Sequence, residues 1–368
     1  MENKEQTSPF FGHVKKKLYL CSVKQNKWLS ILVWAATVAV VLLLAACGLA
    51  WLSEHNWRAK DGESHLLYIY PQTTYAEILT QVEADYDVRF PLLSLALEAK
   101  KLTDCCVRTG CYRLESQMSD RRLWRMLRNG EQVPVKMTFN NIRLPEELAR
   151  RLGAQLMIDS ADIASCLNDS AYMSRFGLSL PEALCLFIPN TYEVWWNMST
   201  DELFERMARE YRAFWNETRR ARCREIGLTP QQAVTLASIV EEETRVDSDK
   251  PKVAGLYLNR LRRGMLLQAD PTVRYATGNF GTRRVLHRDL EVDSPYNTYR
   301  YAGLPPGPIR IPTAKTVEYV LHYTPSNYLY MCASPELDGT HRFTDSYAVH
   351  MRNARDYQRE LNKRGIRR

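Results

Sequence analysis

The longest apolar run in the chain extends from Trp28 to Leu52 and contains no charged residue over 25 positions. A helix of that length can cross a bilayer with some tilt. Trp28 and Trp51 lie near its two ends, where interfacial aromatic residues are expected. The pattern therefore predicts a single membrane-spanning helix over residues 28–52.

The charges on either side of this run predict its orientation. Residues 15–27 before it contain five lysines, whereas residues 53–64 carry two basic and three acidic groups. The positive-inside rule then predicts a cytoplasmic tail over residues 1–27 and a periplasmic, extracytoplasmic remainder anchored in the inner (plasma) membrane. Two alternatives stay open: a cleaved signal peptide, whose apolar core is normally shorter, and a lipoprotein, because Leu44–Cys47 resembles a processing site.

After a linker over residues 53–64, apolar spacing predicts a small module over residues 65–139. We expect, in order, a strand, two helices and a returning strand at His65–Tyr70, Thr74–Val82, Pro91–Lys101 and Thr109–Glu115. A short helix over 119–128 and an alternating strand over 133–139 follow. The βααβ order is typical of a LysM-like glycan-binding domain, and it is also a common small α+β pattern.

Residues 140–368 show a mixture of helical and strand-like patterns, which predicts a second, mixed α+β domain. The expected helices cover residues 144–156, 161–167, 200–226, 248–263, 313–322 and 345–363. A strand or loop is expected at 185–196 and a strand at 328–332, whereas residues 265–300 show little regular pattern. The fold class is therefore α+β, with one anchor helix and two extracytoplasmic parts.

One further helix, beginning at Pro230 after the N-cap candidate Thr229, carries the candidate chemistry. Its apolar residues recur at helical spacing, and continuing that stripe leads to Glu243. Burial raises the pKa of a carboxylic acid, so Glu243 is a candidate general acid. Glu241 and Glu242 fall on other sides of the helix, where we expect a solvated helix end, with Glu241 a candidate support for Glu243.

Composition narrows the function classes. The net charge of +8 is mild, and basic residues are scattered without aromatic interleaving, so nucleic acid is not an expected partner. Nine cysteines and seven histidines form no Cys-x-x-Cys or His-x-x-x-His pair, so no metal site and no other cofactor is predicted.

The segment after the Glu243 helix is dense in polar and aromatic residues of the kind that contact sugars. The candidates for substrate binding are Gln268, Asp270, Thr272, Tyr275, Asn297 and Tyr299. Each also has a structural interpretation, because Asp270–Pro271 is a typical turn initiator and the tyrosines suit a core.

Five motifs in this order resemble the YceG-like (MltG) family of endolytic murein transglycosylases: ASIVEEET at 237–244, KVAGLYLNRL at 252–261, GMLLQADPTV at 264–273, SPYNTY at 294–299 and GLPPGPI at 303–309. Two upstream stretches, GCYRL at 110–114 and FIPNTY at 187–192, also resemble the family. A single N-terminal anchor and the LysM-like module are also similar to the family, and the resemblance covers roughly residues 66–365.

The resemblance implies cleavage of the β-1,4 bond between N-acetylmuramic acid and N-acetylglucosamine within nascent peptidoglycan strands. The cut proceeds without water and leaves a 1,6-anhydro end, which terminates strand growth. The family's catalytic glutamate corresponds to Glu243, and Gln268, Asp270, Asn297 and Tyr299 correspond to substrate contacts, with Thr272 and Tyr275 as weaker candidates. Relatives commonly carry lysine where this chain has Glu242, and that extra acid would favour protonated Glu243. Murein synthases are candidate partners.

Two other functions remain open. A water-using muramidase would employ Glu243 as the acid and Asp270 as the base or nucleophile. A non-enzymatic scaffold would bind glycan within the cell-wall synthesis complex.

Overall fold

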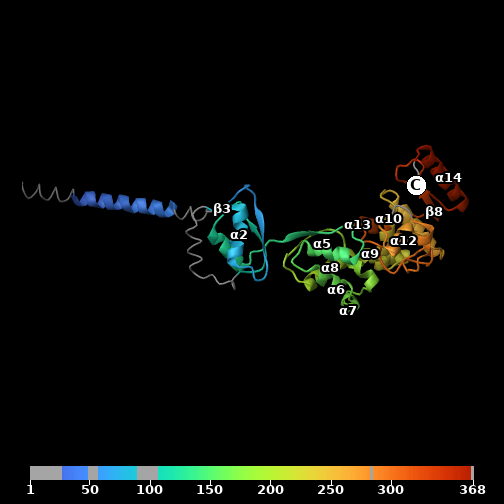
Figure 1. The fold of residues 1–368 in the computed structure, drawn as a ribbon, viewed down its shortest axis with the longest axis horizontal. Coiled ribbons are helices and arrows are strands. Elements are labelled where there is room, and N and C mark those ends of the chain that lie inside the picture. Colours follow the sequence, from blue (N-terminus) through green and yellow to red (C-terminus); the bar gives the residue numbers. More distant parts are fainter. Residues whose placement is uncertain (1–26, 49–56, 89–106, 282–284, 366–368) are drawn as a thin grey trace, which may run out of the picture. The chain divides into compact units, whose positions relative to one another are not determined.

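A computed structural model describes residues 27–48, 57–88, 107–281 and 285–365. The chain divides into two compact units, Met1–Val133 and Pro134–Arg368 (Figure 1). The predicted helix over 91–101, the tail over 1–26 and residues 49–52 of the predicted anchor lie outside the described residues.

An apolar helix over Lys27–Gly48 precedes the first folded unit. Its mean hydropathy of 2.6 makes it apolar enough to cross a membrane, which is consistent with the predicted anchor. The hydroxyl of Thr37 donates to the carbonyl of Val33 at 2.7 Å, so this polar group is satisfied within the helix, as hydrocarbon surroundings require.

Over residues 57–88 and 107–133, the structure describes two small antiparallel sheets and two helices. Strand β2 (His65–Ile69) pairs with β4 (Gly110–Leu114), and β1 (Trp57–Ala59) lies between β3 (Tyr86–Val88) and β5 (Gln117–Met118). Helices α2 (Tyr75–Asp85) and α4 (Asp120–Asn129) complete it. The predicted strand, first helix and returning strand are thus confirmed.

The expectation of a linker over residues 53–64 is wrong where the structure describes it. Trp57 is buried and belongs to the apolar core of the first unit, together with Ile69, Ile78 and Tyr112. Residues 57–59 therefore form a central strand, because the indole of Trp57 is removed from water in this core, whereas an exposed linker would leave it in water.

The second unit begins with the strand pair β6 (Val135–Thr138) and β7 (Thr191–Val194), so the strand predicted near residue 135 lies here rather than with the first unit. Between and after them lie α5 (Pro145–Gly153), α6 (Ser160–Leu167), α7 (Ser170–Ser174), η2 (Leu180–Leu186), α8 (Thr200–Phe214) and α9 (Glu217–Ile226).

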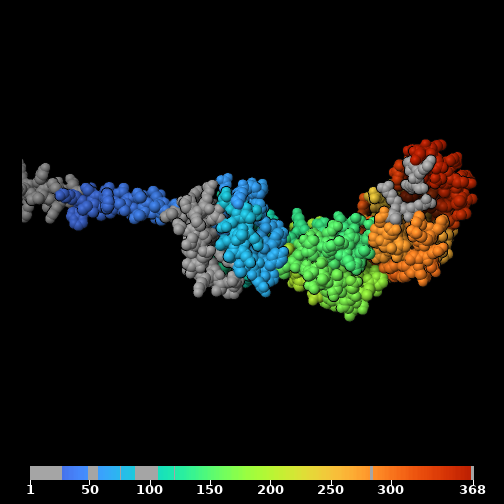
Figure 2. Space-filling view, in the orientation of Figure 1, coloured from blue at the N-terminus to red at the C-terminus, as the bar shows by residue number. Residues whose placement is uncertain are grey.

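The rest of the second unit surrounds one helix, α10 (Pro230–Glu243). It comprises α11 (Lys250–Arg262), α12 (Asp270–Thr277), η3 (His287–Glu291), α13 (Ala314–Leu321), the hairpin β8 (Tyr330–Ala333) and β9 (His341–Thr344), and α14 (Tyr347–Lys363). Within this unit, the orange segments that follow α11 adjoin the green helices α5 to α8 (Figure 2).

Two sequence expectations for this unit are wrong. The single helix over 200–226 is broken at Trp215, whose buried side chain sits in a non-helical residue, and Asn216 caps α9 by accepting from the backbone N–H of Arg219 at 3.0 Å. The irregular segment 265–300 contains α12, because Pro271 occupies the first turn of a helix, where proline is tolerated, rather than a turn.

Helix α10 is held as the central element of the second unit. Thr229 and Gln232 form a capping box at its start, and every residue from Ala233 to Val240 is buried. The buried hydroxyl of Ser238 accepts from the backbone N–H of Ile309 at 3.0 Å, which fixes the proline-rich loop against the helix. That loop approaches η2 so closely that a Cβ on Gly307 would lie 1.9 Å from the carbonyl oxygen of Pro181, so only glycine fits.

Candidate active site

Glu243 is the last residue of α10, and its carboxyl lines a cavity of about 320 Å³. Thr244 leaves the helix in an extended conformation, with φ −142° and ψ 140°. The phenol of Tyr257, on α11, donates to Oε1 of Glu243 at 2.6 Å. The cavity brings Glu243 together with three other predicted site residues, Gln268, Asp270 and Tyr299.

Burial raises the pKa of Glu243 to about 7, against the hydrogen bond from Tyr257, which lowers it. The charge of Asp270 raises the pKa further, and Arg274 and Arg260 lower it. Near neutral pH the carboxyl therefore exists in both protonation states, which suits a group that gives and later regains one proton.

The two neighbouring acids are not a solvated helix end, so that expectation is wrong. The side chain of Glu242 is 12% exposed, and its Oε1 accepts from Arg310 at 2.6 Å and from Arg143 at 2.8 Å. The Oε2 atom of Glu241 accepts from the backbone N–H and the hydroxyl of Thr313, both at 2.9 Å, at the start of α13. Two guanidinium groups neutralise Glu242. The negative charge that raises the pKa of Glu243 therefore comes from Asp270 and not from Glu242.

Arg260, one turn beyond Tyr257 on α11, holds the opposite wall of the cavity. Its Nε donates to the carbonyl of Leu329 at 2.7 Å, and its Nη1 donates to the carbonyl of Leu267 at 2.8 Å. Nη1 also lies 3.4 Å from Oε1 of Gln268. A buried charge is stable only when it is well paired or hydrogen-bonded, so Arg260 fixes the segment that carries Gln268.

Gln268 and Asp270 are presented by a strained turn at the start of α12. Gln268 has φ 51°, a left-handed conformation unusual for a residue other than glycine, and its N–H donates to the carbonyl of Thr298 at 3.1 Å. The phenol of Tyr299 donates to Oδ1 of Asp270 at 2.5 Å. These contacts hold an amide and a carboxylate at the cavity wall.

Thr272 and Asn297 are fully buried and do not line this cavity. Thr272 lies 2.8 Å from the hydroxyl of Thr298 and donates to the carbonyl of Ala269 at 2.7 Å. Asn297 donates to the carbonyls of Leu290 and Val292 at 2.9 and 2.8 Å and accepts from the N–H of Tyr299 at 3.0 Å. In this conformation both residues shape the loop that presents Asp270 and Tyr299.

Tyr275 lies apart from the Glu243 cavity. Its ring centroid is 4.7 Å from that of Tyr296, and it lines a separate small pocket with Glu242, Arg274 and Phe280.

The sequence reasoning missed several residues of the cavity: Tyr257, Arg260, Met331 and His350. Tyr257 and Arg260 share one face of α11 at i,i+3 spacing, which is a signal that the sequence did contain. Burial lowers the pKa of His350, whose ring stacks 5.4 Å from that of Tyr330, so the imidazole is neutral at pH 7. Met331 and His350 come from β8 and α14, and no local pattern links those elements to α10.

Comparison with known proteins decides the family. The profile of the YceG-like family matches residues 67–356, which is most of the chain. The chain belongs to the YceG-like family. Like other YceG-like proteins, it combines strands and helices in a mixed α+β fold.

Relatives of known name support this membership. An endolytic murein transglycosylase of Bacillus subtilis is 35% identical over 166 residues, covering 45% of this chain and 45% of that protein. An endolytic murein transglycosylase of Streptococcus pneumoniae is 26% identical over 317 residues, covering 76% of this chain and 56% of that protein. The chain thus spans about half the length of the curated relatives it matches.

A solved structure shares the fold. The 2.6 Å crystal structure of a yceG-like protein of Listeria monocytogenes superposes with a TM-score of 0.52 at 24% identity. The match covers 79% of this chain and 99% of that one.

Proposed function

We propose that this YceG-like protein is an endolytic murein transglycosylase that cuts the N-acetylmuramic acid–N-acetylglucosamine β-1,4 bond without water. The observation that carries the proposal is Glu243. It is a half-buried carboxyl with a pKa of about 7 that is hydrogen-bonded to Tyr257 in a polar cavity. Two relatives that bear this activity in their names support the reaction class.

In the first step, protonated Glu243 donates its proton to the glycosidic oxygen. The bond from that oxygen to C1 of the muramic acid breaks, and the N-acetylglucosamine hydroxyl leaves. The positive charge that develops at C1 is stabilised by the substrate's own N-acetyl group and by nearby polar groups, among which Asp270 carries a negative charge.

In the second step, the Glu243 carboxylate takes the proton of the C6 hydroxyl as that oxygen bonds to C1. The product is a 1,6-anhydro sugar, and Glu243 returns to its protonated form. One carboxyl serves both steps because the nucleophile belongs to the substrate, whereas a hydrolase normally needs a second carboxyl. The hydrogen bond from Tyr257 stabilises the intermediate carboxylate.

We assign Gln268, Asp270 and Tyr299 to substrate contact, because all three line the cavity. Thr272 and Asn297 act as supports of that loop, since their polar atoms bond to the protein. Tyr275 is left as a contact for a more distant sugar, since it lines a neighbouring pocket.

The remaining chain suits this activity. The apolar helix at 27–48 would anchor the protein in the inner membrane with a cytoplasmic N-terminus and a periplasmic catalytic domain, where nascent glycan lies. The β2–α2–β4 arrangement supports a LysM-like role in glycan binding, which would place the protein beside murein synthases.

The proposal is tested by Glu243→Gln in the full chain incubated with purified murein. We expect anhydro-product formation to fall by about 10²–10⁴-fold, because glutamine cannot transfer the proton. Mass spectrometry of the muropeptides measures the anhydro ends. Unchanged yields of anhydro ends from a folded variant would overturn the assignment, and a non-enzymatic scaffold predicts no anhydro ends from either protein.

Asp270 allows a second candidate, hydrolysis, because its carboxylate lines the same cavity as Glu243. The parent protein distinguishes the two, since a muramidase leaves reducing ends. Asp270→Asn should reduce transglycosylation by on the order of tenfold through lost positioning, and it should lower the pKa of Glu243 because it removes a negative charge. Reducing ends in the parent, lost in Asp270→Asn, would establish hydrolysis instead.

A further inference from the structure

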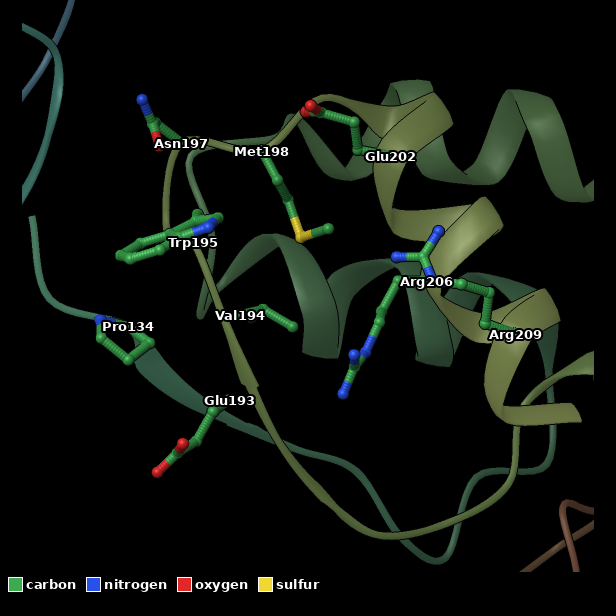
Figure 3. A pocket seen from close by; sticks show the side chains of 9 residues that line it. All are labelled: Pro134, Glu193, Val194, Trp195, Asn197, Met198, Glu202, Arg206 and Arg209. Atoms are coloured by element: carbon green, nitrogen blue, oxygen red, sulfur yellow. The ribbon is translucent and has the colours of Figure 1, made fainter. Parts of the chain in front are cut away.

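A second cavity, of about 520 Å³, lies between strand β7 and helix α8 and shares no lining residue with the Glu243 cavity (Figure 3). Trp195 lies on the strand side, Arg206 and Arg209 lie on the helix, and Met198 lies between them (Figure 3). Its size is in the range of sites that bind small ligands or one or two sugar rings.

Trp195 supplies an aromatic surface to this cavity. Its side chain is 53% exposed, whereas its neighbour Trp196 is 4% exposed and packs inside. The alternation of β7 (Thr191–Val194) continues through these two residues, so the two indoles point to opposite faces. Burying a large apolar indole normally stabilises a fold. An indole that stays exposed beside a cavity is therefore typical of a binding surface.

The charged groups around Trp195 are planar, and some of them are bonded within the protein. Oε2 of Glu202 accepts from the backbone N–H of Ser199 at 2.7 Å and from its hydroxyl at 3.0 Å. Arg206 makes one ion pair, from Nη2 to Oε1 of Glu210 at 2.9 Å. Within the described part of the chain, the side chains of Glu193 and Arg209 make no hydrogen bond or ion pair. Carboxylate and guanidinium groups can each bind two neighbouring hydroxyls through paired hydrogen bonds.

The charge balance limits the ligand class. The cavity is lined by two glutamates, Glu193 and Glu202, and two arginines, Arg206 and Arg209, so its formal charges cancel. A polyanion such as nucleic acid requires an excess of positive charge. An uncharged polyhydroxylated ring fits the cancelled formal charge of the lining, and it can stack on the exposed indole of Trp195.

We propose that this cavity is a second glycan-binding site, in which a pyranose ring of a murein strand stacks on Trp195. The ring's hydroxyl and acetamido groups would bond to Glu193, Arg206 and Arg209. The inference rests on the proposed function for the choice of murein as the glycan. A strand held both here and in the Glu243 cavity gains affinity from the linkage of two contacts, so long strands would bind more tightly than short ones.

The test measures binding to the full chain in detergent micelles, in the Glu243→Gln background so that the glycan is not consumed. The probes are purified murein glycan strands, one set of long strands and one of tetrasaccharides. Trp195→Ala should weaken binding of long strands by on the order of tenfold and leave the tetrasaccharide that occupies the Glu243 cavity unaffected. Trp195→Phe should retain most of the affinity because it keeps an aromatic face.

Arg209→Ala should weaken the same binding severalfold, and Arg212→Ala is its matched control, because Arg212 is exposed on the same helix and does not line the cavity. Urea unfolding midpoints confirm that each variant is folded. Equal affinity of Trp195→Ala and its parent for long strands would overturn the proposal, as would an equal loss for both probes. The proposed transglycosylase activity is tested separately. It would be refuted, and the second glycan site kept, if the protein with Glu243 intact yields no anhydro ends while long-strand binding still depends on Trp195.

Discussion

Glu242 and Glu243 are consecutive residues of one helix turn, yet they lie in opposite chemical environments. Glu242 accepts from two arginines, at 2.6 and 2.8 Å, and its charge is fully compensated. Glu243 meets a neutral phenol and a second carboxylate, and its pKa rises to about 7 because burial outweighs the hydrogen bond from Tyr257 and the charges of Arg274 and Arg260. The same side chain is thus a structural anion at one position and a proton donor at the next.

The comparison shows that the hydrogen-bond partners of Glu242 and Glu243, more than the depth at which each carboxyl is buried, determine their different properties. All three acids at the end of α10 are removed from bulk water to a similar degree. Direct hydrogen bonds from cations keep a carboxylate ionised, whereas desolvation without them favours the neutral acid. Each of the following experiments changes one partner on one side of this turn.

The largest effect is expected from Arg310→Met, which removes one of the two cations from Glu242. The variant should lose about 2–4 kcal/mol of stability, because the Glu242 carboxylate, 12% exposed, is left with Arg143 alone. Urea denaturation of the full chain measures the loss.

Two comparisons sharpen that experiment. The double change of Arg310→Met with Glu242→Met should recover part of the lost stability, because the Glu242 carboxylate is removed together with its cation, whereas Glu241 still loses Arg310, 3.6 Å away. Arg359→Met removes an exposed arginine paired with Asp356 and should change stability by less than about 1 kcal/mol. Equal losses in the free energy of unfolding for Arg359→Met and Arg310→Met would show that the Glu242 ion pairs stabilise the protein no more than an exposed pair does.

Glu243→Gln should have a smaller effect on stability, opposite in sign and dependent on pH. The folded pKa of Glu243, about 7, lies above its ordinary value of 4.5, so the folded protein binds the extra proton between those values. Stability of the parent therefore falls as pH rises from about 4.5 to 7, and the variant lacks this loss.

Thermal unfolding of the two proteins at pH 4.5 and pH 8 measures this difference. At pH 8 the variant should be the more stable by on the order of 1–2 kcal/mol, after allowance for partial exposure of the side chain, and at pH 4.5 the two should be similar. A variant less stable than the parent at pH 8 would contradict a desolvated Glu243.

Tyr257→Phe should produce the smallest change, a shift in the pH dependence of activity. The phenol of Tyr257 lowers the pKa of Glu243 by bonding to the carboxylate, so its removal should raise that pKa further above 7. Because the first step needs protonated Glu243, the fall of kcat/KM at alkaline pH should move to higher pH.

Tyr323→Phe is a matched control, since its hydroxyl contacts Arg262 outside the cavity. It should leave the pH profile unchanged. A shift of the Tyr257→Phe profile to lower pH would show that the phenol does not stabilise the charged form of Glu243.

Much of the site follows from the chain itself. The apolar stripe of α10 indicates which of three acids turns inward, and the ordered motifs indicate that Gln268, Asp270 and Tyr299 come to the same wall. The inward turn of Glu243 follows from local chemistry, because helix period and capping depend on neighbours in sequence, whereas the choice of Gln268, Asp270 and Tyr299 rests on the resemblance of the motifs to the YceG-like family.

The remaining features depend on contacts between distant segments. Arg310 lies 68 residues from the Glu242 that it neutralises, so the solvated helix end was a natural but wrong prediction. The start of α12 was missed because Asp270–Pro271 opens a turn and a helix equally well, and only the packing of Val273 against the core selects the helix. The break at Trp215 likewise follows from burial of that indole, and a helical period does not reveal it.

The single hydroxyl of Ser238 joins the proline-rich loop to the interior of α10, five residues before Glu243. We therefore expect the proline-rich loop and α10 to move together. A ligand that displaced the loop near Ile309 should therefore shift the proposed catalytic carboxyl of Glu243 without entering the cavity that holds it.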